Sequence, residues 1–275
     1  MPDDPAQELN PVERIGARLL AGLRYAGGLS YLLAQTVRWT IGGLLLPKVK
    51  FGKQAIAAQM IRVGVRSLGI IMLVQLFMGV ILALQLTPPL EKPYHQEQQV
   101  ARIIGVGSFR MLGPILAAVV LSGFAGASIA AELGTMVVAE EIEAMEAMAL
   151  NPVRFLVVPR VLATSLMTVL LAAVSDITIA FGGYATSRLV MSPGTYEGYW
   201  DRMQDQLRYT DLVTGLTMAL VFGILISLIA CHEGLKVKGG AEGVGRATTM
   251  TVVYSIVGII SAAGVFTIIF YAFGW

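Results

Sequence analysis

The 275-residue chain has few charged side chains and little cysteine or histidine. Only 14% of its residues are Asp, Glu, Lys or Arg, whereas soluble domains carry roughly 25%. The net charge of +2 is too small to indicate a nucleic-acid partner, and no Lys/Arg cluster is interleaved with aromatic residues. The single cysteine, Cys231, cannot form an intrachain disulfide. This composition departs from that of soluble domains.

Signatures of catalysis and nucleotide binding are also missing. Gly240 and Gly245 have the spacing of a P-loop, but Arg246 and Ala247 stand where Lys and Ser or Thr are needed. No Gly-x-Ser-x-Gly motif is present. No histidine has cysteine neighbours at the spacing of metal ligands. We therefore expect no enzyme site, no metal and no bound cofactor in this chain.

What the chain has instead is long apolar runs. Hydrophobic residues make up 56% of the sequence, and the mean hydropathy is +0.71. A helix of about 20 apolar residues crosses a hydrocarbon core of about 30 Å, and lipid leaves no unpaired backbone group, so each span should be helical. The sequence predicts an all-α integral membrane protein whose five spans lie at about 67–87, 104–131, 157–187, 212–231 and 250–273.

Two regions follow from this pattern: residues 1–66 and a five-span domain at 67–275. Apolar residues in 9–26 repeat at helical spacing between arginines, which predicts an amphipathic helix lying in the membrane interface. A helix packed on a soluble core is the alternative. Residues 29–46 are more apolar and could form a second interfacial segment or a re-entrant one.

The distribution of Lys and Arg predicts the orientation. Most of them fall in 1–66, 132–160 and 232–249, and fewer in 88–103 and 188–211. Cytoplasmic segments carry the excess of basic residues. We therefore place the N-terminus in the cytoplasm and the C-terminus outside.

One predicted cytoplasmic loop contains a short amphipathic helix. The segment 138–150 alternates acidic and apolar residues at helical spacing, and Asn151-Pro152 should end it. Its acidic residues are Glu140, Glu141, Glu143 and Glu146, and its apolar residues include Ile142, Met145, Ala149 and Leu150.

Ionisable side chains within the spans are rare, and two of them have more than one interpretation. Asp176 could be a relay or substrate group, or it could hydrogen-bond Ser175 or Thr178 in helix packing. Arg110 could extend to the outer headgroups, or it could face a cavity and hold a phosphate. The sequence leaves both pairs of alternatives open.

Three sequence motifs resemble those of a known protein family. The segment 126–160, GASIAAELGTMVVAEEIEAMEAMALNPVRFLVVPR, resembles the signature of the MlaE/YrbE family of permeases. The segment 239–255, GGAEGVGRATTMTVVYS, resembles that family's second signature. Leu112-Gly113-Pro114 after Arg110 resembles a third. The resemblance extends from about residue 50 to the C-terminus.

The resemblance implies an ABC transporter permease that forms a homodimer in the inner membrane of a double-membraned bacterium. ABC ATPase subunits would bind ATP and Mg²⁺ from the cytoplasm, a periplasmic MCE-domain protein would cap the dimer, and a STAS-domain protein is a further candidate partner. Such complexes move phospholipids between the inner and outer membranes and maintain outer-membrane lipid asymmetry. Related systems move sterols or other hydrophobic compounds.

The resemblance also implies roles for particular residues. The loop helix would be the coupling helix that docks into the ATPase, and a lipid pocket would lie at the dimer centre. The coupling residues would be Glu140, Glu141, Ile142, Glu143 and Met145, and the pocket residues Leu82, Leu86, Arg110 and Met111.

The chain departs from the family pattern at three places. Met111 replaces a usual glutamate, Phe124 stands where an arginine is usual, and the last span has Ala262, Ala263 and Gly264 where an acidic residue is often found. These changes leave the expected pocket less charged. A secondary carrier or channel that uses Asp176 is the main alternative function, and a membrane anchor without a pocket is a third.

Overall fold

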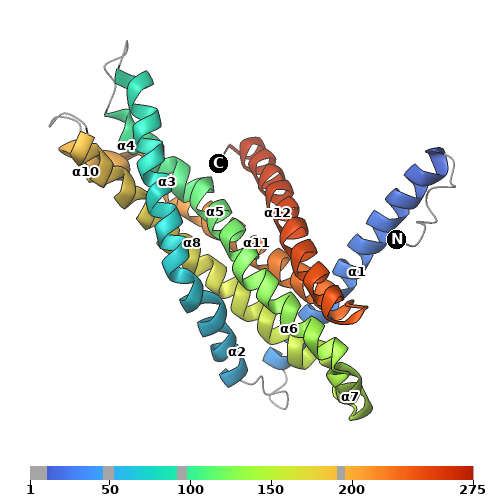
Figure 1. The fold of residues 1–275 in the computed structure, drawn as a ribbon. Helices are drawn as coiled ribbons and strands as arrows, with labels where there is room; N and C mark the ends of the chain where they lie inside the picture. The colour runs from blue at the N-terminus through green and yellow to red at the C-terminus, as the bar shows by residue number, and fades with distance from the viewer. Residues whose placement is uncertain (1–10, 46–52, 92–97, 191–195, 275) are drawn as a thin grey trace. The chain divides into compact units, whose positions relative to one another are not determined.

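The computed structural model describes residues 11–45, 53–91, 98–190 and 196–274. Within these ranges the chain is helical and contains no strand (Figure 1). Five helical segments are long and apolar enough to cross a membrane, which confirms the predicted all-α membrane protein. These segments are Gln54–Leu90, Gln99–Val138, Val153–Val190, Tyr209–Leu235 and Gly240–Ala272.

The chain divides into two compact units, residues 1–50 and 51–275. In the first, α1 (Pro11–Leu45) is one helix of 35 residues, where the sequence suggested two segments. Its placement in the membrane interface stays a prediction. The boundary predicted between residues 66 and 67 falls inside an unbroken helical segment of the second unit.

Short π-helical turns interrupt the first two spans of the second unit, and another begins the third. A π-turn contains one residue more than an α-turn and is rare, and it is frequent at functional sites. The first span comprises α2 (Lys53–Met60), η2 (Ile61–Val65) and α3 (Arg66–Glu91). The second comprises α4 (Gln99–Gly107), η3 (Ser108–Leu112), α5 (Gly113–Leu121), η4 (Ser122–Gly126) and α6 (Ala127–Val138).

The remaining elements complete the helical bundle. The short helix α7 leads into the third span, and α10 connects the third span to the fourth. They are α7 (Glu141–Ala147), η5 (Val153–Val157), α8 (Val158–Val190), α10 (Tyr199–Gln206), α11 (Tyr209–Leu235) and α12 (Gly240–Ala272).

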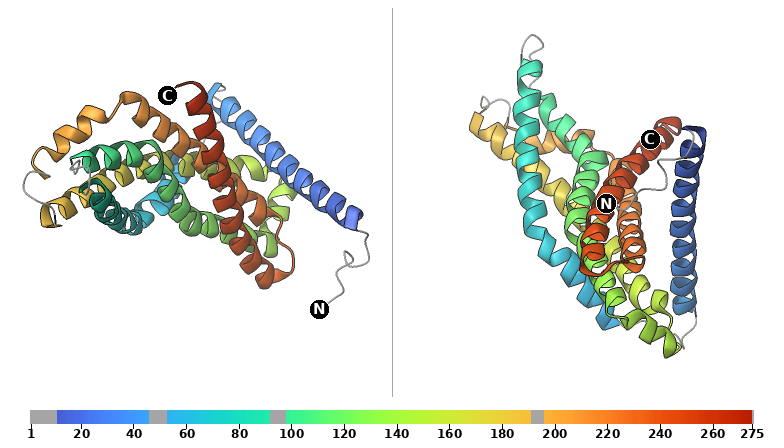
Figure 2. Two further views of the ribbon diagram at one scale, coloured as in Figure 1. Left: turned by 90° about the horizontal axis from the view of Figure 1, so that it is seen from above. Right: turned by 45° about the vertical axis from the view of Figure 1, so that its right-hand side comes forward.

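The helix α8 lies at the centre of this unit and α12 at its edge. α8 packs against α3, α5 and α11, whereas α12 packs mainly against α11 and α6 (Figure 2). As a result, 67% of the most apolar window of the α8 span is buried, against 17% for α12. A cluster of Ala118, Met218, Phe222, Ile226, Ile259, Ala263 and Phe270 joins α5, α11 and α12.

The contact between α3 and α8 depends on two glycines. A Cβ atom at Gly79 would lie 2.1 Å from the carbonyl oxygen of Ile179, and one at Gly182 would lie 2.4 Å from that of Leu76. Such distances are far below van der Waals contact. The two backbones therefore approach closely only because neither position carries a side chain.

The connection between the last two spans is shorter than the sequence suggested. The predicted fourth and fifth spans leave 232–249 as the segment between them, but α11 continues to Leu235 and α12 begins at Gly240. Gly239 and Gly240 have φ of +87° and +69°, which lets the chain reverse within a few residues. The following glycines lie in the first turns of α12, so this segment is a helix start rather than a loop.

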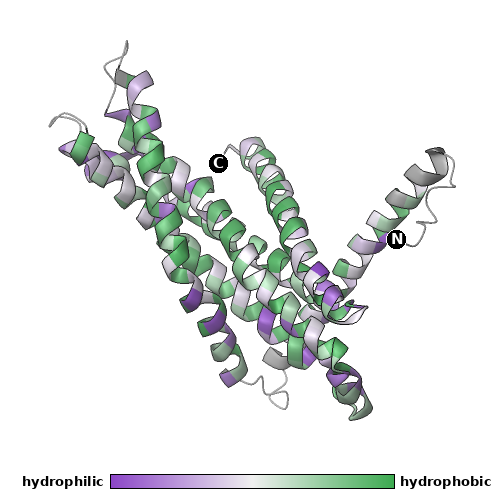
Figure 3. Cartoon of the chain, in the orientation of Figure 1, coloured by the Kyte–Doolittle hydropathy of each residue, from purple (hydrophilic) through white to green (hydrophobic). Residues whose placement is uncertain are grey.

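Hydropathy varies along the helices of the second unit. Figure 3 shows mostly hydrophobic ribbon through the middle of the bundle, with hydrophilic residues on α2, on α6 and at the start of α12. These hydrophilic segments lie towards the end of the bundle that carries α7.

Candidate functional site

A cavity of about 570 Å³ opens at the end of the bundle opposite α7. The turn η3 carries Arg110 and Met111 into its wall, so the structure brings together two of the four predicted pocket residues. Gly215 of α11 allows this arrangement, because a Cβ there would lie 2.0 Å from the carbonyl oxygen of Phe109. The lining is mainly apolar: Val106, Gly107, Arg110, Met111, Met218, Thr267, Phe270, Tyr271 and Gly274.

Asp211 holds Arg110 at the edge of this cavity. Arg110 Nη1 lies 3.5 Å from Asp211 Oδ1, and the side chains are 35% and 7% exposed. The other carboxylate oxygen of Asp211 accepts a hydrogen bond of 3.0 Å from the backbone N–H of Arg208, which caps the start of α11. The carboxylate thus fixes a helix terminus and orients a guanidinium at the same time.

Two smaller hollows adjoin the cavity and add arginines to its rim. One, of about 430 Å³, includes Arg102, and the other, of about 310 Å³, includes Arg110 and Arg208. Our sequence reasoning missed Arg102 and Arg208. The four-residue steps from Arg102 through Val106 to Arg110 place these residues along one helix face, and this spacing was the available signal.

Leu82 and Leu86 do not line these hollows. Both are partly buried on α3, where they pack against a separate cluster of buried residues. That cluster joins α3, α4 and α8, and consists of Ala83, Val100, Ile104 and Ile179. Within one chain, therefore, the four residues predicted for the pocket form two groups, and their common role in lipid binding stays a prediction.

At the other end of the bundle, α7 stands apart from the packed helices. It contains no buried residue and contacts mainly α6. Glu140, Glu141 and Glu143 are exposed, and Ile142 and Met145 are half-buried. This is the surface that the sequence predicts to couple the chain to an ATPase.

The helix α7 ends earlier than predicted. We expected it to reach Asn151-Pro152, but it ends at Ala147. Ala149 has φ of +59°, its N–H donates to the carbonyl of Glu146, and the N–H of Leu150 donates to the carbonyl of Met145. This hydrogen-bond pattern closes the helix in a Schellman motif, which the sequence did not indicate because Gly usually occupies the left-handed position.

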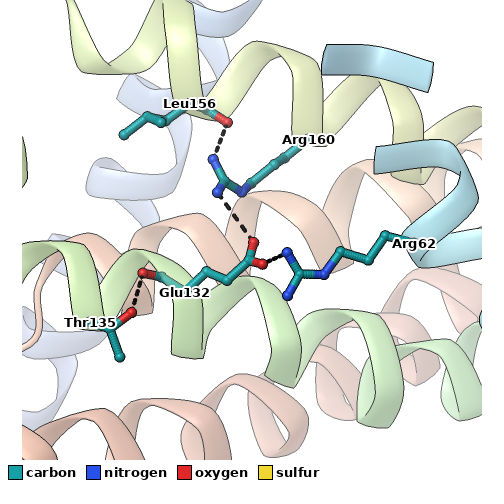
Figure 4. Close-up of polar contacts among 5 residues, drawn as sticks. All are labelled: Arg62, Glu132, Thr135, Leu156 and Arg160. Carbon is teal, nitrogen blue, oxygen red and sulfur yellow. Dashed lines mark hydrogen bonds and ion pairs between the residues drawn. The ribbon is translucent and has the colours of Figure 1, made fainter. Parts of the chain in front are cut away.

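Glu132 joins three helices just before the α7 loop. One carboxylate oxygen pairs with Arg62 of η2, and the other accepts a hydrogen bond of 3.2 Å from Nη2 of Arg160 on α8 (Figure 4). Arg160 Nη1 also donates to the carbonyl of Leu156 at 2.9 Å. The Arg160 side chain is only 9% exposed, so it depends on this carboxylate for charge compensation. Glu132 therefore ties α6 to α8, the two helices that the α7 loop connects.

Asp176 is buried in the middle of α8. Its side chain packs against Gly113, where a Cβ would lie 1.8 Å from Asp176 Oδ1. The hydroxyl of Thr178 donates to the carbonyl of Val174, 2.7 Å away. Asp176 is not among the residues that line the hollows described above.

No metal centre is found in the part of the chain that the structure describes. Groups of three or more His, Cys, Asp or Glu side chains close enough to hold an ion do not occur there. Cys231 is buried and reduced.

Comparison with known proteins gives a consistent result. The family described as "Permease MlaE" matches residues 56–269. A "Probable ABC transporter permease protein" of Rickettsia typhi is 35% identical over 200 residues, which cover 73% of this chain and 76% of the relative. A protein of the same name from Rickettsia bellii is 32% identical over 266 residues, or 96% and 98% of the two chains.

A third relative matches almost end to end. It is the "Intermembrane phospholipid transport system permease protein MlaE" of Haemophilus influenzae, 27% identical over 270 residues, or 97% of this chain and 99% of the relative. The five apolar helices agree with the multi-pass membrane location of a permease. With a family match over more than half of its length, this chain belongs to the MlaE family of transporter permeases.

Proposed function

We propose that this chain is the membrane subunit of an ABC transporter that moves phospholipids between the inner and outer membranes and so maintains outer-membrane lipid asymmetry. The observation that carries the proposal is the apolar cavity of about 570 Å³ with Arg102, Arg110 and Arg208 around it and the adjoining hollows. The name of the Haemophilus influenzae relative supports the same substrate.

The cavity has the two kinds of surface that a phospholipid needs. Its apolar lining favours acyl chains, which gain about 0.8 kcal/mol for each CH₂ removed from water. Arg110 at the edge can form charge-assisted hydrogen bonds to the phosphate. Met111 beside it is exposed and uncharged, so the arginine faces no second carboxylate from its own turn.

We infer that α7 receives the mechanical input. ATP and Mg²⁺ would bind to separate ATPase subunits, and closure of these subunits would push on the exposed acidic surface of α7. Glu132 pairs with Arg62 and Arg160, so it would carry that displacement into the first three spans together. The cavity at the far end would then change shape and pass its lipid onward, without any chemical step in this chain.

The remaining proposed partners are those that the family resemblance implies. Most of α12 and much of α3 are unburied, which suits a homodimer in which Leu82 and Leu86 approach the cavity of a second copy. A periplasmic MCE-domain protein would cap the end that carries Arg110, and a STAS-domain protein would join the ATPase. In this proposal the chain lies in the bacterial inner membrane, with its N-terminus in the cytoplasm and its C-terminus in the periplasm.

The test is ATP-dependent lipid transfer by the purified complex in liposomes. We expect the double charge reversal Glu140→Lys/Glu141→Lys to reduce transfer at least tenfold while the protein still inserts, because it reverses the charge of the surface offered to the ATPase. Glu197→Lys, at an exposed position of the opposite end, is the matched control and should transfer lipid normally. Unchanged transfer by the double variant, with ATPase subunits still bound, would refute the coupling role.

The carrier alternative depends on Asp176, and the same assay separates it from the proposal. Asp176 is 1% exposed and packs against Gly113. Transport that follows an ion gradient without ATP, and is lost in Asp176→Asn, would favour the carrier over the ATP-driven permease.

A further inference from the structure

A second, smaller hollow lies at the end of the bundle that carries α7. Its volume is about 70 Å³, and the first and second spans form its walls. A water molecule needs about 10–15 Å³ of such space, so the hollow holds several waters or one phosphate group, but not an acyl chain. Its polar lining residues are Gln59, Arg62, Arg66, Ser128 and Glu132.

Two π-helical turns meet at this hollow. η2 contributes Arg62 and Val63 to the lining, η4 contributes Phe124 and Ala125, and the two turns contact each other. π-turns are rare and concentrate at functional sites. The meeting of two of them, on spans far apart in sequence, singles out this position in the fold.

The charges around the hollow favour an anion. Both oxygens of the only carboxylate, Glu132, are already engaged, one with Arg62 and one with Arg160. Arg66 forms no ion pair with any residue that the structure describes. Arg62 and Arg160 already balance the charge of Glu132, so the guanidinium of Arg66, which also lines the hollow, adds a positive charge that no carboxylate in the lining compensates.

Neutral donors complete the set. The amide oxygen of Gln59 is buried and has no hydrogen-bond partner among the described atoms, so rotation of the amide would turn its NH₂ group towards an anion. Ser128, which carries a hydroxyl donor, lines the same hollow. An acceptor with several oxygens, such as a phosphate, can satisfy these groups at once.

Exposed apolar side chains neighbour the residues that line the hollow. Ile61, Val65 and Phe124 are 58%, 61% and 40% exposed. Phe124 also lines the hollow, so the apolar surface continues directly from the cationic site. A ligand with a phosphate at one end and hydrocarbon at the other matches this pairing, whereas a free phosphate would use only the polar part.

We propose that the hollow at Arg66 binds the phosphate of an anionic membrane lipid, whose acyl chains lie against Phe124 and the exposed side chains of η2. This site is separate from the cavity at Arg110 and lies at the opposite end of the bundle. It requires no ATPase, so it can be tested even if the proposed transport function fails.

The test counts lipid bound to the purified full-length chain by native mass spectrometry, with added phosphatidylglycerol. The chain is compared with Arg66→Gln, with Arg110→Gln and with the double variant, because the outer cavity is also proposed to bind lipid. We expect Arg66→Gln to weaken the affinity roughly tenfold, as for loss of a charge-assisted hydrogen bond, and to remove lipid beyond that lost in Arg110→Gln. Arg66→Lys should recover part of the affinity.

Arg246→Gln is the matched control, since Arg246 is an exposed arginine near the start of α12 and lines no hollow described here. It should bind as the unmodified chain does. The proposal is overturned if Arg66→Gln removes no lipid beyond Arg110→Gln, or if Arg246→Gln loses as much. Equal binding of phosphatidylcholine would show that no anionic lipid is selected, and displacement by millimolar inorganic phosphate would assign the hollow to a free anion; either result contradicts it.

Discussion

Both ends of the bundle pair arginine with a carboxylate, but the surroundings of the two pairs differ. At the α7 end, Glu132 contacts two arginines, and one of them, Arg160, is almost fully buried. At the other end, Asp211 caps α11 and reaches Arg110 at 3.5 Å beside a large cavity. The first pair holds helices together, whereas the second presents a guanidinium at the edge of an apolar space.

This difference predicts that removing each carboxylate lowers the stability of the chain by a different amount. Glu132→Ala should have the largest effect, because it leaves the charge of the buried Arg160 uncompensated. We expect it to lower the free energy of unfolding by about 3–5 kcal/mol. The measurement is the midpoint of thermal unfolding in detergent, with Glu242→Ala, an exposed glutamate of α12, as control.

A second variant sharpens the interpretation of Glu132. Replacing both charges in Glu132→Leu/Arg160→Met should recover much of the lost stability, because no unpaired buried charge then remains. If Glu132→Ala unfolds at the same temperature as the Glu242→Ala control, the cluster is not the structural tie that the geometry indicates.

Asp211→Ala should lower the free energy of unfolding by a smaller amount, about 1–2 kcal/mol, which is the usual effect of losing a helix cap. It would also release Arg110 from its position, so lipid binding at the outer cavity should weaken together with stability. Thermal unfolding and lipid retention by the same preparation measure the two effects. Asp205→Ala, at an exposed position of α10, is the control. If Asp211→Ala loses as much stability as Glu132→Ala, the two carboxylates do not differ in their contribution to stability and the comparison fails.

The smallest expected effect concerns the loop helix, and its sign is opposite. Ala149 occupies a left-handed conformation with φ of +59°, which is unfavourable for a residue with a Cβ. Ala149→Gly should therefore stabilise the chain by about 0.5–1 kcal/mol. Ala147→Gly, two residues earlier inside α7, should destabilise it by a similar amount. Amide hydrogen exchange in the α7 loop can detect both changes, and slower exchange in Ala147→Gly than in Ala149→Gly would contradict this account.

Much of the fold followed from the sequence because its signals are local. The five spans were predicted from runs of apolar residues, and each lies inside an observed membrane-length helix or within a residue of its end. The predicted spans were too short, because helices such as Tyr209–Leu235 extend beyond the apolar run into polar residues. A hydropathy pattern detects contact with lipid, but not where the helical hydrogen bonds stop.

The candidate sites were predictable only in part. Arg110 and Met111 were found through a motif, and both line the outer cavity. Leu82 and Leu86 lie in a different cluster, and the contact of Glu132 with Arg62 and Arg160 was not foreseen. Glu132, Arg62 and Arg160 come from three different spans, and no local sequence pattern indicates which faces of distant helices meet.

The sequence by itself determined that the chain is a bundle of membrane-spanning helices, because about 20 consecutive apolar residues have no stable place in water. It also determined the family, through motifs that are contiguous in the chain. Only the tertiary structure decided which arginine is buried against a carboxylate and which lies beside a cavity. That distinction depends on close approach at positions such as Gly79, Gly182 and Gly215, where the absence of a side chain sets how the helices pack.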